Sequence, residues 1–439
     1  MNITETRARA LTSGPRSHFV GFHDIVPWDE RERYILCLEA DEMAPKGAPA
    51  SVGLVDLRDP ERPLQRVADT TAWTYHVGAR QQWLKDDLFL YNAVRDGRYY
   101  GIIESVAAGP QDQIEGGIWD VGADGRWGLA PSFARSDRYY ASYGFTGGTA
   151  PSLDDPAPND DGLYLVELST GQRTLRFSVA EIAAQVYPQR AARTPTPAWL
   201  SHPAFNPDGS RFCFYLRHYR HDGTLHSDFF VADRTVGPAR CLLRGRVSHF
   251  AWLDADRLLI YARLMGRRDT IRAARAVRHP IVRSTLTLAR KLKKAMPRRR
   301  GTAGGGGHLV LDVRTGATTV LAPDLLVVDG HQQFTSDRRW MVCDTYADRR
   351  RNQRLFLFDM RQKRRVELGD FPEPERLRGA PPLAQVHRDG GQNFACNLHP
   401  RWNRAGTAVC FDWADDRGRQ VYMIDVSNHT RDVAAVAAA

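Results

Sequence analysis

The sequence predicts an all-β protein, a seven-bladed β-propeller with a basic insertion in blade five. Four segments share one pattern: a His, two residues, an aromatic residue, a polar turn and then an apolar strand. Short strand-like runs and polar turns recur throughout the 439 residues, whereas helix-like periodicity is scarce. A repeat of roughly 40 to 70 residues fits the four-stranded blades of a propeller.

The four strongest copies of the pattern lie in the second half of the chain. They begin at His202, His249, His331 and His399. Each is followed by a second apolar strand, and these strands begin at Phe229, Leu309, Leu355 and Val421. The fourth position of the pattern is aromatic in every copy, which is typical of a buried strand inside a repeated sheet.

Three weaker copies precede these four and begin at Trp28, Trp83 and Val121. One four-stranded unit cannot bury both of its faces alone, so we expect the seven units to close into a ring. We therefore predict a single domain over residues 1–439. The predicted blades are residues 17–70, 71–117, 118–199, 200–246, 247–326, 327–385 and 386–430.

Helix is expected to be scarce. Residues 178–185 have helical spacing, and Ser178 precedes Glu181 by three residues, which is typical of a capped helix start. Tyr139, Tyr140 and Tyr143 are expected in a glycine-rich loop of the third unit.

The net charge of +10 is concentrated in one segment. Residues 267–300 hold thirteen Lys or Arg, opposed only by Asp269, so the rest of the chain is close to neutral. This distribution does not favour a nucleic-acid partner for the whole fold. We predict that residues 266–307 form a basic, partly disordered insertion. An alternative is a basic amphipathic element that contacts an anionic membrane surface through residues 267–300.

The composition also excludes several classes of protein. No run of about 18 apolar residues is present, so no membrane-spanning helix is expected. The first residues lack the apolar stretch of a secretory signal, which favours a cytoplasmic location, peripheral to the inner membrane face if the insertion binds lipid. The six cysteines form no CxxC pair and are expected to be reduced thiols, most of them buried.

The repeated histidines are the first candidates for chemistry. Each lies where the innermost strand of a blade begins, so four equivalent positions predict convergence at one mouth of the central channel. Converging imidazoles can bind a divalent metal ion or transfer protons. The alternative is a structural role, in which each His bonds the backbone of a neighbouring blade.

Other polar residues are expected on the same rim. His76, Arg80 and Arg217 lie near the start or end of inner strands. Tyr143 lies in the glycine-rich loop of the third unit, and His23 and Asp24 open the first unit. An Arg can neutralise a substrate carboxylate and so acidify the α-proton, which a His or Tyr then removes. This set favours β-elimination on a uronic acid. Hydrolysis by a carboxylate pair fits less well, and the common nucleophile, zinc-protease and phosphate-loop motifs are absent.

These segments resemble a group of bacterial propeller enzymes. Asp329-Gly-His-Gln-Gln-Phe, Asp344-Thr-Tyr, Ser248-His-Phe-Ala-Trp and Asn397-Leu-His-Pro-Arg-Trp are similar to sequences in oligogalacturonate lyases, ulvan lyases and rhamnose–glucuronate lyases. The resemblance extends from about residue 17 to residue 426 and implies a seven-bladed propeller with its active site in a central funnel.

The resemblance also implies roles for particular residues. A divalent metal ion, Mn²⁺ first with Ca²⁺ or Zn²⁺ as alternatives, would be held by His249, His331, Gln332 and His399. His76, Tyr143 and Arg217 match the residues that act around the sugar ring, with His202 as an alternative base.

The predicted function is therefore a lyase that cleaves an acidic, uronic-acid-containing oligosaccharide by β-elimination. Two alternatives remain open from the sequence. One is a glycosyltransferase or another enzyme of cell-surface polysaccharide biosynthesis that uses the same funnel. The other is a non-catalytic propeller that binds a glycan or a protein.

Overall fold

A computed structural model describes residues 8–59, 61, 63–187, 196–220, 223–264, 306–377, 390–416 and 418–430. The predicted basic insertion, residues 266–307, lies outside these ranges except for its last two residues.

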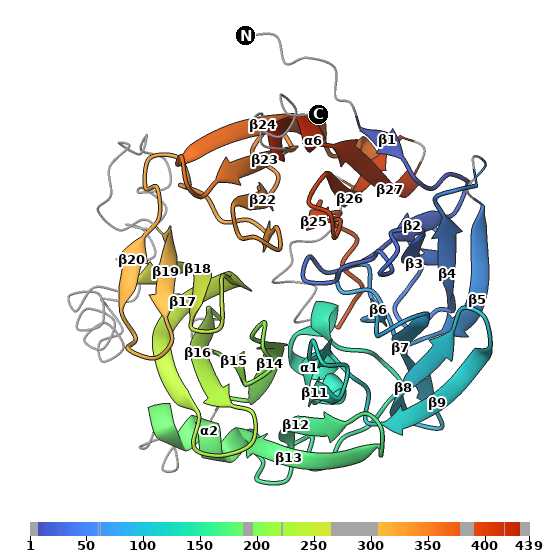
Figure 1. Ribbon diagram of the computed structural model, residues 1–439. Helices are drawn as coiled ribbons and strands as arrows, with labels where there is room; N and C mark the ends of the chain where they lie inside the picture. Colours follow the sequence, from blue (N-terminus) through green and yellow to red (C-terminus); the bar gives the residue numbers. More distant parts are fainter. Residues whose placement is uncertain are drawn as a thin grey trace.

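Antiparallel sheet dominates the described residues, which hold five four-stranded sheets and one seven-stranded sheet. Figure 1 shows these sheets arranged in sequence order around a common centre. The arrangement is consistent with a β-propeller and agrees with the all-β prediction.

The three N-terminal sheets have four strands each. The first holds β2 (Ser17–Phe19), β3 (Tyr34–Ala40), β4 (Ala50–Asp56) and β5 (Leu64–Thr70). The second holds β6 (Gln82–Trp83), β7 (Leu88–Arg95), β8 (Arg98–Ser105) and β9 (Gly109–Glu115). The third holds β10 (Asp120–Val121), β11 (Trp127–Pro131), β12 (Gly162–Glu167) and β13 (Gln172–Ser178).

The seven-stranded sheet follows. It holds β14 (Ala198–Phe205), β15 (Arg211–Tyr219), β16 (Leu225–Asp233), β17 (Arg240–Trp252), β18 (Arg257–Leu264), β19 (Gly307–Asp312) and β20 (Thr318–Val320). The first half of β17 pairs with β16, and its second half pairs with β18.

Two further sheets complete the ring. One holds β21 (Gln332–Phe334), β22 (Trp340–Asp344), β23 (Asn352–Asp359) and β24 (Arg364–Pro372). The last holds β25 (Arg401–Trp402), β26 (Ala408–Asp415), β27 (Gly418–Asp425) and, from the other end of the chain, β1 (Arg9–Ala10). Because β1 pairs with β27, the first described residues join the last sheet and close the ring.

The hydrophobic cores lie between neighbouring sheets. One cluster combines Leu129 and Phe177 of the third sheet with Phe212, Phe214 and Phe230 of the next. Another combines Leu36 and Leu54 of the first sheet with Phe89 and Tyr91 of the second. Burial of each apolar face therefore depends on the adjacent sheet, which is the physical reason that the repeats form a ring.

The helices of the described residues are few and short. They are α1 (Phe133–Tyr139), η1 (Ala141–Tyr143), α2 (Val179–Val186), η3 (Glu375–Leu377) and α6 (Ser427–Thr430). The helix expected at residues 178–185 is confirmed: the Ser178 side chain accepts a hydrogen bond from the backbone N–H of Glu181. None of the helices among the described residues has the length and apolar character needed to cross a bilayer.

The prediction that Tyr139, Tyr140 and Tyr143 lie in a glycine-rich loop is wrong. Tyr139 ends α1 and Tyr143 ends η1. The Ser132 side chain caps α1 by accepting a hydrogen bond from the Arg135 backbone N–H. Figure 1 shows α1 on the inner side of the ring, beside β11. The six cysteines all carry free thiols, and five of them are buried, as the sequence predicted.

Candidate functional site

Histidine and aromatic rings from every part of the molecule meet around Phe22. This buried side chain follows β2, and its ring centroid lies between 5.4 and 6.4 Å from those of His76, Tyr143, His202, His331 and His399. The next residue, His23, contacts the rings of His249, His331 and His399. We call these eight residues, from Phe22 to His399, the central cluster. The convergence predicted from the repeats is therefore present.

Local backbone distortions direct these side chains to the centre. The strand register shifts between Ser201 and Ala204, beside His202, and between Val247 and Phe250, beside His249. Such bulges turn a side chain out of the regular strand alternation. Arg80, His202 and His399 have φ values of 53°, 53° and 45°, a left-handed conformation that is uncommon for residues other than glycine. Arg80 therefore matches the two histidines in conformation as well as in repeat position.

Three histidines on one side of the cluster are oriented in the way that metal ligands are. His249 Nδ1 lies 3.0 Å from Asp329 Oδ1, His331 Nδ1 lies 2.9 Å from Asp344 Oδ1, and His399 Nδ1 lies 2.6 Å from the Gly21 carbonyl oxygen. Each acceptor fixes the hydrogen on Nδ1 and leaves the lone pair on Nε2, the usual arrangement behind a metal-binding imidazole.

The surroundings of the Nε2 atoms of these three histidines agree with that orientation. Nε2 of His331 and Nε2 of His399 are buried and have no hydrogen-bond partner among the described residues. His249 Nε2 lies 3.2 Å from the Tyr346 hydroxyl. Burial lowers the pKa of His331 and of His399 well below the usual value, so both rings are neutral at neutral pH. Burial raises the pKa of Asp344 to about 6, which still leaves a carboxylate to accept from His331 at neutral pH.

Gln332 lies beside these histidines at the start of β21. Its amide nitrogen donates a hydrogen bond of 2.9 Å to the His249 carbonyl oxygen. Its Oε1 is buried without a hydrogen-bond partner in the described part of the chain. The side chain thus contributes a structural bond to β17 and has one oxygen left to bind a cation.

A histidine and a tyrosine form a pair on the other side of the cluster. His76 Nε2 lies 2.7 Å from the Tyr143 hydroxyl oxygen, and the Tyr143 ring lies 4.5 Å from that of His202. Burial raises the pKa of Tyr143 well above its usual value, so the phenol keeps its proton. Burial, followed by the nearby Arg217, lowers the pKa of His202, so this imidazole is neutral. The pair and the third ring offer a proton donor and a proton acceptor within one small space.

Arg217 is a buried cation without an ion-pair partner among the described residues. It lies on β15, only 5% exposed, with its guanidinium carbon 4.8 Å from the Tyr140 ring and 4.6 Å from the Tyr215 ring. Its Nε and Nη1 atoms have no hydrogen-bond partner, and no carboxylate pairs with it, within the described ranges. Burying an uncompensated charge is costly, so this geometry favours an anionic ligand.

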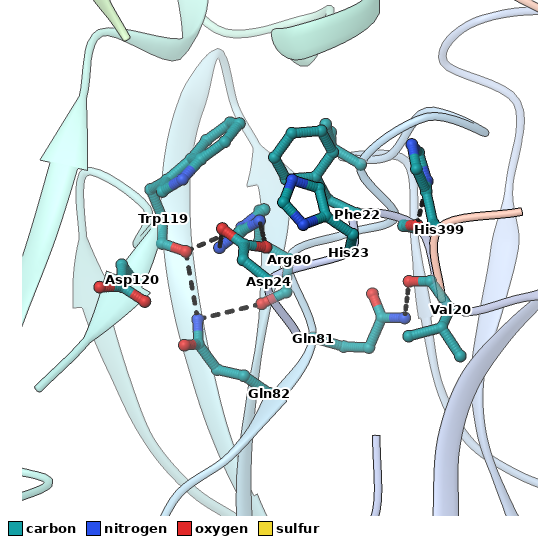
Figure 2. Close-up of polar contacts among 12 residues, drawn as sticks. Val20, Phe22, His23, Asp24, Arg80, Gln81, Gln82, Trp119, Asp120 and His399 are labelled. Atoms are coloured by element: carbon teal, nitrogen blue, oxygen red, sulfur yellow. Dashed lines mark hydrogen bonds and ion pairs between the residues drawn. The ribbon is translucent and has the colours of Figure 1, made fainter. Parts of the chain in front are cut away.

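Arg80 differs from Arg217 in this respect. Figure 2 shows its guanidinium between Asp24 and Trp119. Arg80 Nη1 and Nη2 donate to the Asp24 carboxylate at 2.6 and 3.2 Å, and Nε donates to the Trp119 carbonyl oxygen at 2.8 Å. Each guanidinium nitrogen of Arg80 thus has an acceptor, and Asp24 compensates the charge. This bonding favours a structural role for Arg80 over ligand binding.

Sequence reasoning found most of the cluster and missed part of it. His76, Tyr143, His202, His249, His331 and His399 are brought together, with Gln332 and Arg217 at its edge. From the sequence, His23 is expected only at the opening of the first unit, and Phe22 is not among the expected site residues. Figure 2 shows both between Trp119 and His399. A lone Phe-His pair carries no repeat signal, so no sequence feature predicted that these rings fill the centre.

The donor nitrogens of the central histidines are not assembled as a compact metal site. Among the described residues, the three His or carboxylate ligands whose donor atoms lie within 4.8 Å of one another are His218, His226 and Asp228. These residues lie on β15 and β16, outside the central cluster. Metal binding in the centre therefore requires side-chain movements.

Solved structures share this fold. One is an oligogalacturonate lyase in complex with manganese, with a TM-score of 0.59 and 14% identity over 95% of this chain and 93% of that chain. Another is an oligogalacturonate lyase from Vibrio parahaemolyticus, with a TM-score of 0.60 and 12% identity over 96% and 94%. No protein-family model and no curated protein matches the sequence. The structural similarity to oligogalacturonate lyase predicted from the motifs is confirmed, and at these identities it is a likeness of fold.

Proposed function

We propose that the protein is a lyase that cleaves a uronic-acid-containing oligosaccharide by β-elimination at the central cluster. The observation that carries the proposal is Arg217, a buried guanidinium beside His202 and Tyr143, with two nitrogen atoms that have no hydrogen-bond partner in the described part of the chain. A sugar carboxylate would supply the missing negative charge and two acceptor oxygens in one planar contact.

The chemistry follows from the groups around that carboxylate. With the charge neutralised by Arg217, the proton on the carbon next to the carboxylate becomes more acidic. Neutral His202 removes this proton, and the electron pair forms a carbon–carbon double bond as the neighbouring bond to the glycosidic oxygen breaks. Tyr143 donates its proton to the departing oxygen. His76, hydrogen-bonded to Tyr143, holds the phenol in place for that transfer.

A divalent metal ion is part of the proposal. His249, His331 and His399, with Gln332 Oε1, would hold it. Nε2 of His331, Nε2 of His399 and Gln332 Oε1 are buried without partners among the described residues, and His249 Nε2 contacts the Tyr346 hydroxyl. The ion would supply a second positive charge to stabilise the developing carbanion. A donor set with three imidazoles disfavours calcium, which prefers oxygen ligands, and suits zinc, while the Gln332 oxygen also suits manganese. The manganese complex of a lyase with this fold supports manganese as the first candidate.

The proposal includes seven blades in one domain. Five are the four-stranded sheets. The seven-stranded sheet supplies two, because β17 continues from the outer edge of one blade into the centre of the next. The change of partner along β17 occurs at Gly245, which pairs with both Ser227 and Leu264.

The proposal is tested with a panel of uronic-acid oligosaccharides and the ultraviolet absorbance of the unsaturated uronide. We expect absorbance to rise with Mn²⁺, to stop after chelation and to return when Mn²⁺ is added back. The matched control is the same oligosaccharide with its carboxyl groups reduced to alcohols, which should give no signal. A flat trace across the panel with folded, metal-loaded protein would contradict the lyase and favour glycan synthesis or binding. A signal that survives chelation would contradict the proposed metal dependence but would still support lyase activity.

A further inference from the structure

A second group of histidines lies outside the central cluster, on the hairpin of β15 and β16. His218 and His226 are directly paired across the two strands, with ring centroids 5.1 Å apart. Asp228 follows His226 by two residues and so points to the same face of the sheet. The register of the hairpin therefore brings two imidazoles and one carboxylate together.

These three side chains are already close to a metal-binding geometry. Their donor atoms all lie within 4.8 Å of one another, and His226 Nε2 is 3.1 Å from Asp228 Oδ1. Ligands around a tetrahedral zinc ion are separated by about 3.4 Å, given bonds of about 2.1 Å, so binding needs shifts of about 1 Å. His218 and Asp228 are buried, whereas His226 is half-buried and leaves a route from solvent.

The surrounding contacts orient the ligands. His218 Nδ1 lies 3.2 Å from the Tyr219 carbonyl oxygen, which can accept a hydrogen bond from the tautomer that binds a metal ion through Nε2. That Nε2 lies 3.0 Å from the Tyr187 hydroxyl, which is also 2.6 Å from Asp228 Oδ2. Arg244, paired with Asp228 in the strand register, donates to Asp228 Oδ1 at 3.4 Å. A carbonyl behind the imidazole and a donor behind the carboxylate are usual around bound metal ions.

We propose that His218, His226 and Asp228 bind a divalent transition-metal ion of the zinc type, at a site separate from the central cluster. Two imidazole nitrogens and one carboxylate favour zinc and disfavour magnesium and calcium, which prefer all-oxygen sites. Tyr187 Oη or a water molecule would supply the fourth ligand. The site does not depend on the proposed lyase activity.

The place of the site in the fold indicates a structural role. His218 directly follows Arg217 on β15, and Tyr187 directly follows α2. A metal ion there would join the ends of β15 and β16 to the end of α2. It would therefore hold the strand end that carries Arg217.

The test uses the full-length protein, stripped of metal and titrated with Zn²⁺ by calorimetry, together with the visible spectrum of the Co²⁺-loaded protein. We expect a zinc equivalent whose affinity falls by more than about 100-fold in His226→Ala and in Asp228→Asn. The Co²⁺ bands of a site with nitrogen and oxygen ligands should disappear in the same variants. His226→Ala is chosen because this ring is half-buried, and Asp228→Asn because it keeps the side-chain shape.

Two variants serve as controls. His429→Ala removes a histidine on α6, away from the hairpin, and should change nothing. His399→Ala removes a proposed ligand of the central metal and should leave the hairpin equivalent in place. Equal zinc stoichiometry and affinity in wild type, His226→Ala and Asp228→Asn would overturn the proposal, whatever the result at the central cluster.

Discussion

Arg217 and Arg80 are both buried near the central cluster, and their surroundings give them opposite roles. Arg80 is bonded on three nitrogens to Asp24 and Trp119, so its charge is compensated within the protein. Arg217 lies between two tyrosine rings, and two of its nitrogens lack acceptors in the described structure. A buried guanidinium with unsatisfied nitrogens reduces the stability of the ligand-free protein. This cost is expected where binding a carboxylate offsets it.

The buried histidines of the central cluster should make the free energy of unfolding depend on pH. The pKa of His202 is lowered in the folded protein, mainly by burial, while the unfolded chain titrates near 6.5. As the pH falls through that value, the unfolded state takes up the proton first, so the folded state loses relative stability. Lowering the pH from about 7.5 to about 5.5 should cost about 1 kcal/mol for this one residue.

The measurement compares denaturant unfolding of wild type and His202→Asn across that pH range. Asn tolerates the left-handed backbone at this position. We expect the free energy of unfolding of wild type to fall more steeply than that of the variant. Parallel curves would show that His202 is not held neutral.

At the scale of elements, the segment that carries Tyr143 is held from another sheet. Lys46, in the connection between β3 and β4, donates to the Asp137 carboxylate and, at 2.5 Å, to the Ala141 carbonyl oxygen. Thr74 donates to the Ser142 carbonyl oxygen at 2.9 Å. Contacts from the first two sheets thus fix α1 and η1 of the third, and with them the distance between Tyr143 and His76.

Lys46 is therefore a positioning residue for the proposed reaction. Replacing it with Met should lower the turnover rate of elimination about tenfold with little change in KM, because substrate contacts remain while Tyr143 shifts. Lys46→Arg should restore part of the rate. The exposed Arg98→Gln serves as a control, since the Arg98–Glu115 pair lies on the surface. A rate for Lys46→Met equal to that of wild type would show that η1 is positioned without this contact.

Predictability from sequence differed between element types. The sheets followed from repeat spacing, because each strand carries its own apolar pattern. The α1–η1 segment was missed because α1 buries Phe133, Ala134, Arg135 and Ser136 on consecutive positions and lacks an apolar stripe of helical period. Ser132 before it was the one local signal of a helix start.

At the scale of the whole molecule, the closure of the ring determines which central residues could be predicted from the sequence. Residues at equivalent repeat positions meet at the centre, so His202, His249, His331 and His399 could be grouped in advance. Phe22 could not, because its central place depends on how the first unit enters the ring. The hairpin cluster depended on strand register, which pairs His218 with His226 eight residues later. The difference in bonding between Arg80 and Arg217 could not be predicted, because it depends on which carboxylates the fold places beside each guanidinium.

The most direct test of the central claim compares Arg217→Met with Arg80→Met in two measurements, the elimination rate and the free energy of unfolding. For Arg217→Met we predict a rate loss of more than about 100-fold, with stability unchanged or higher by about 1–4 kcal/mol, because an uncompensated buried charge is removed. Arg80→Met should lower stability by about 1–3 kcal/mol, because it removes bonds to Asp24 and Trp119. A variant Arg217→Met that keeps the wild-type rate would contradict the assignment of this guanidinium to the substrate carboxylate.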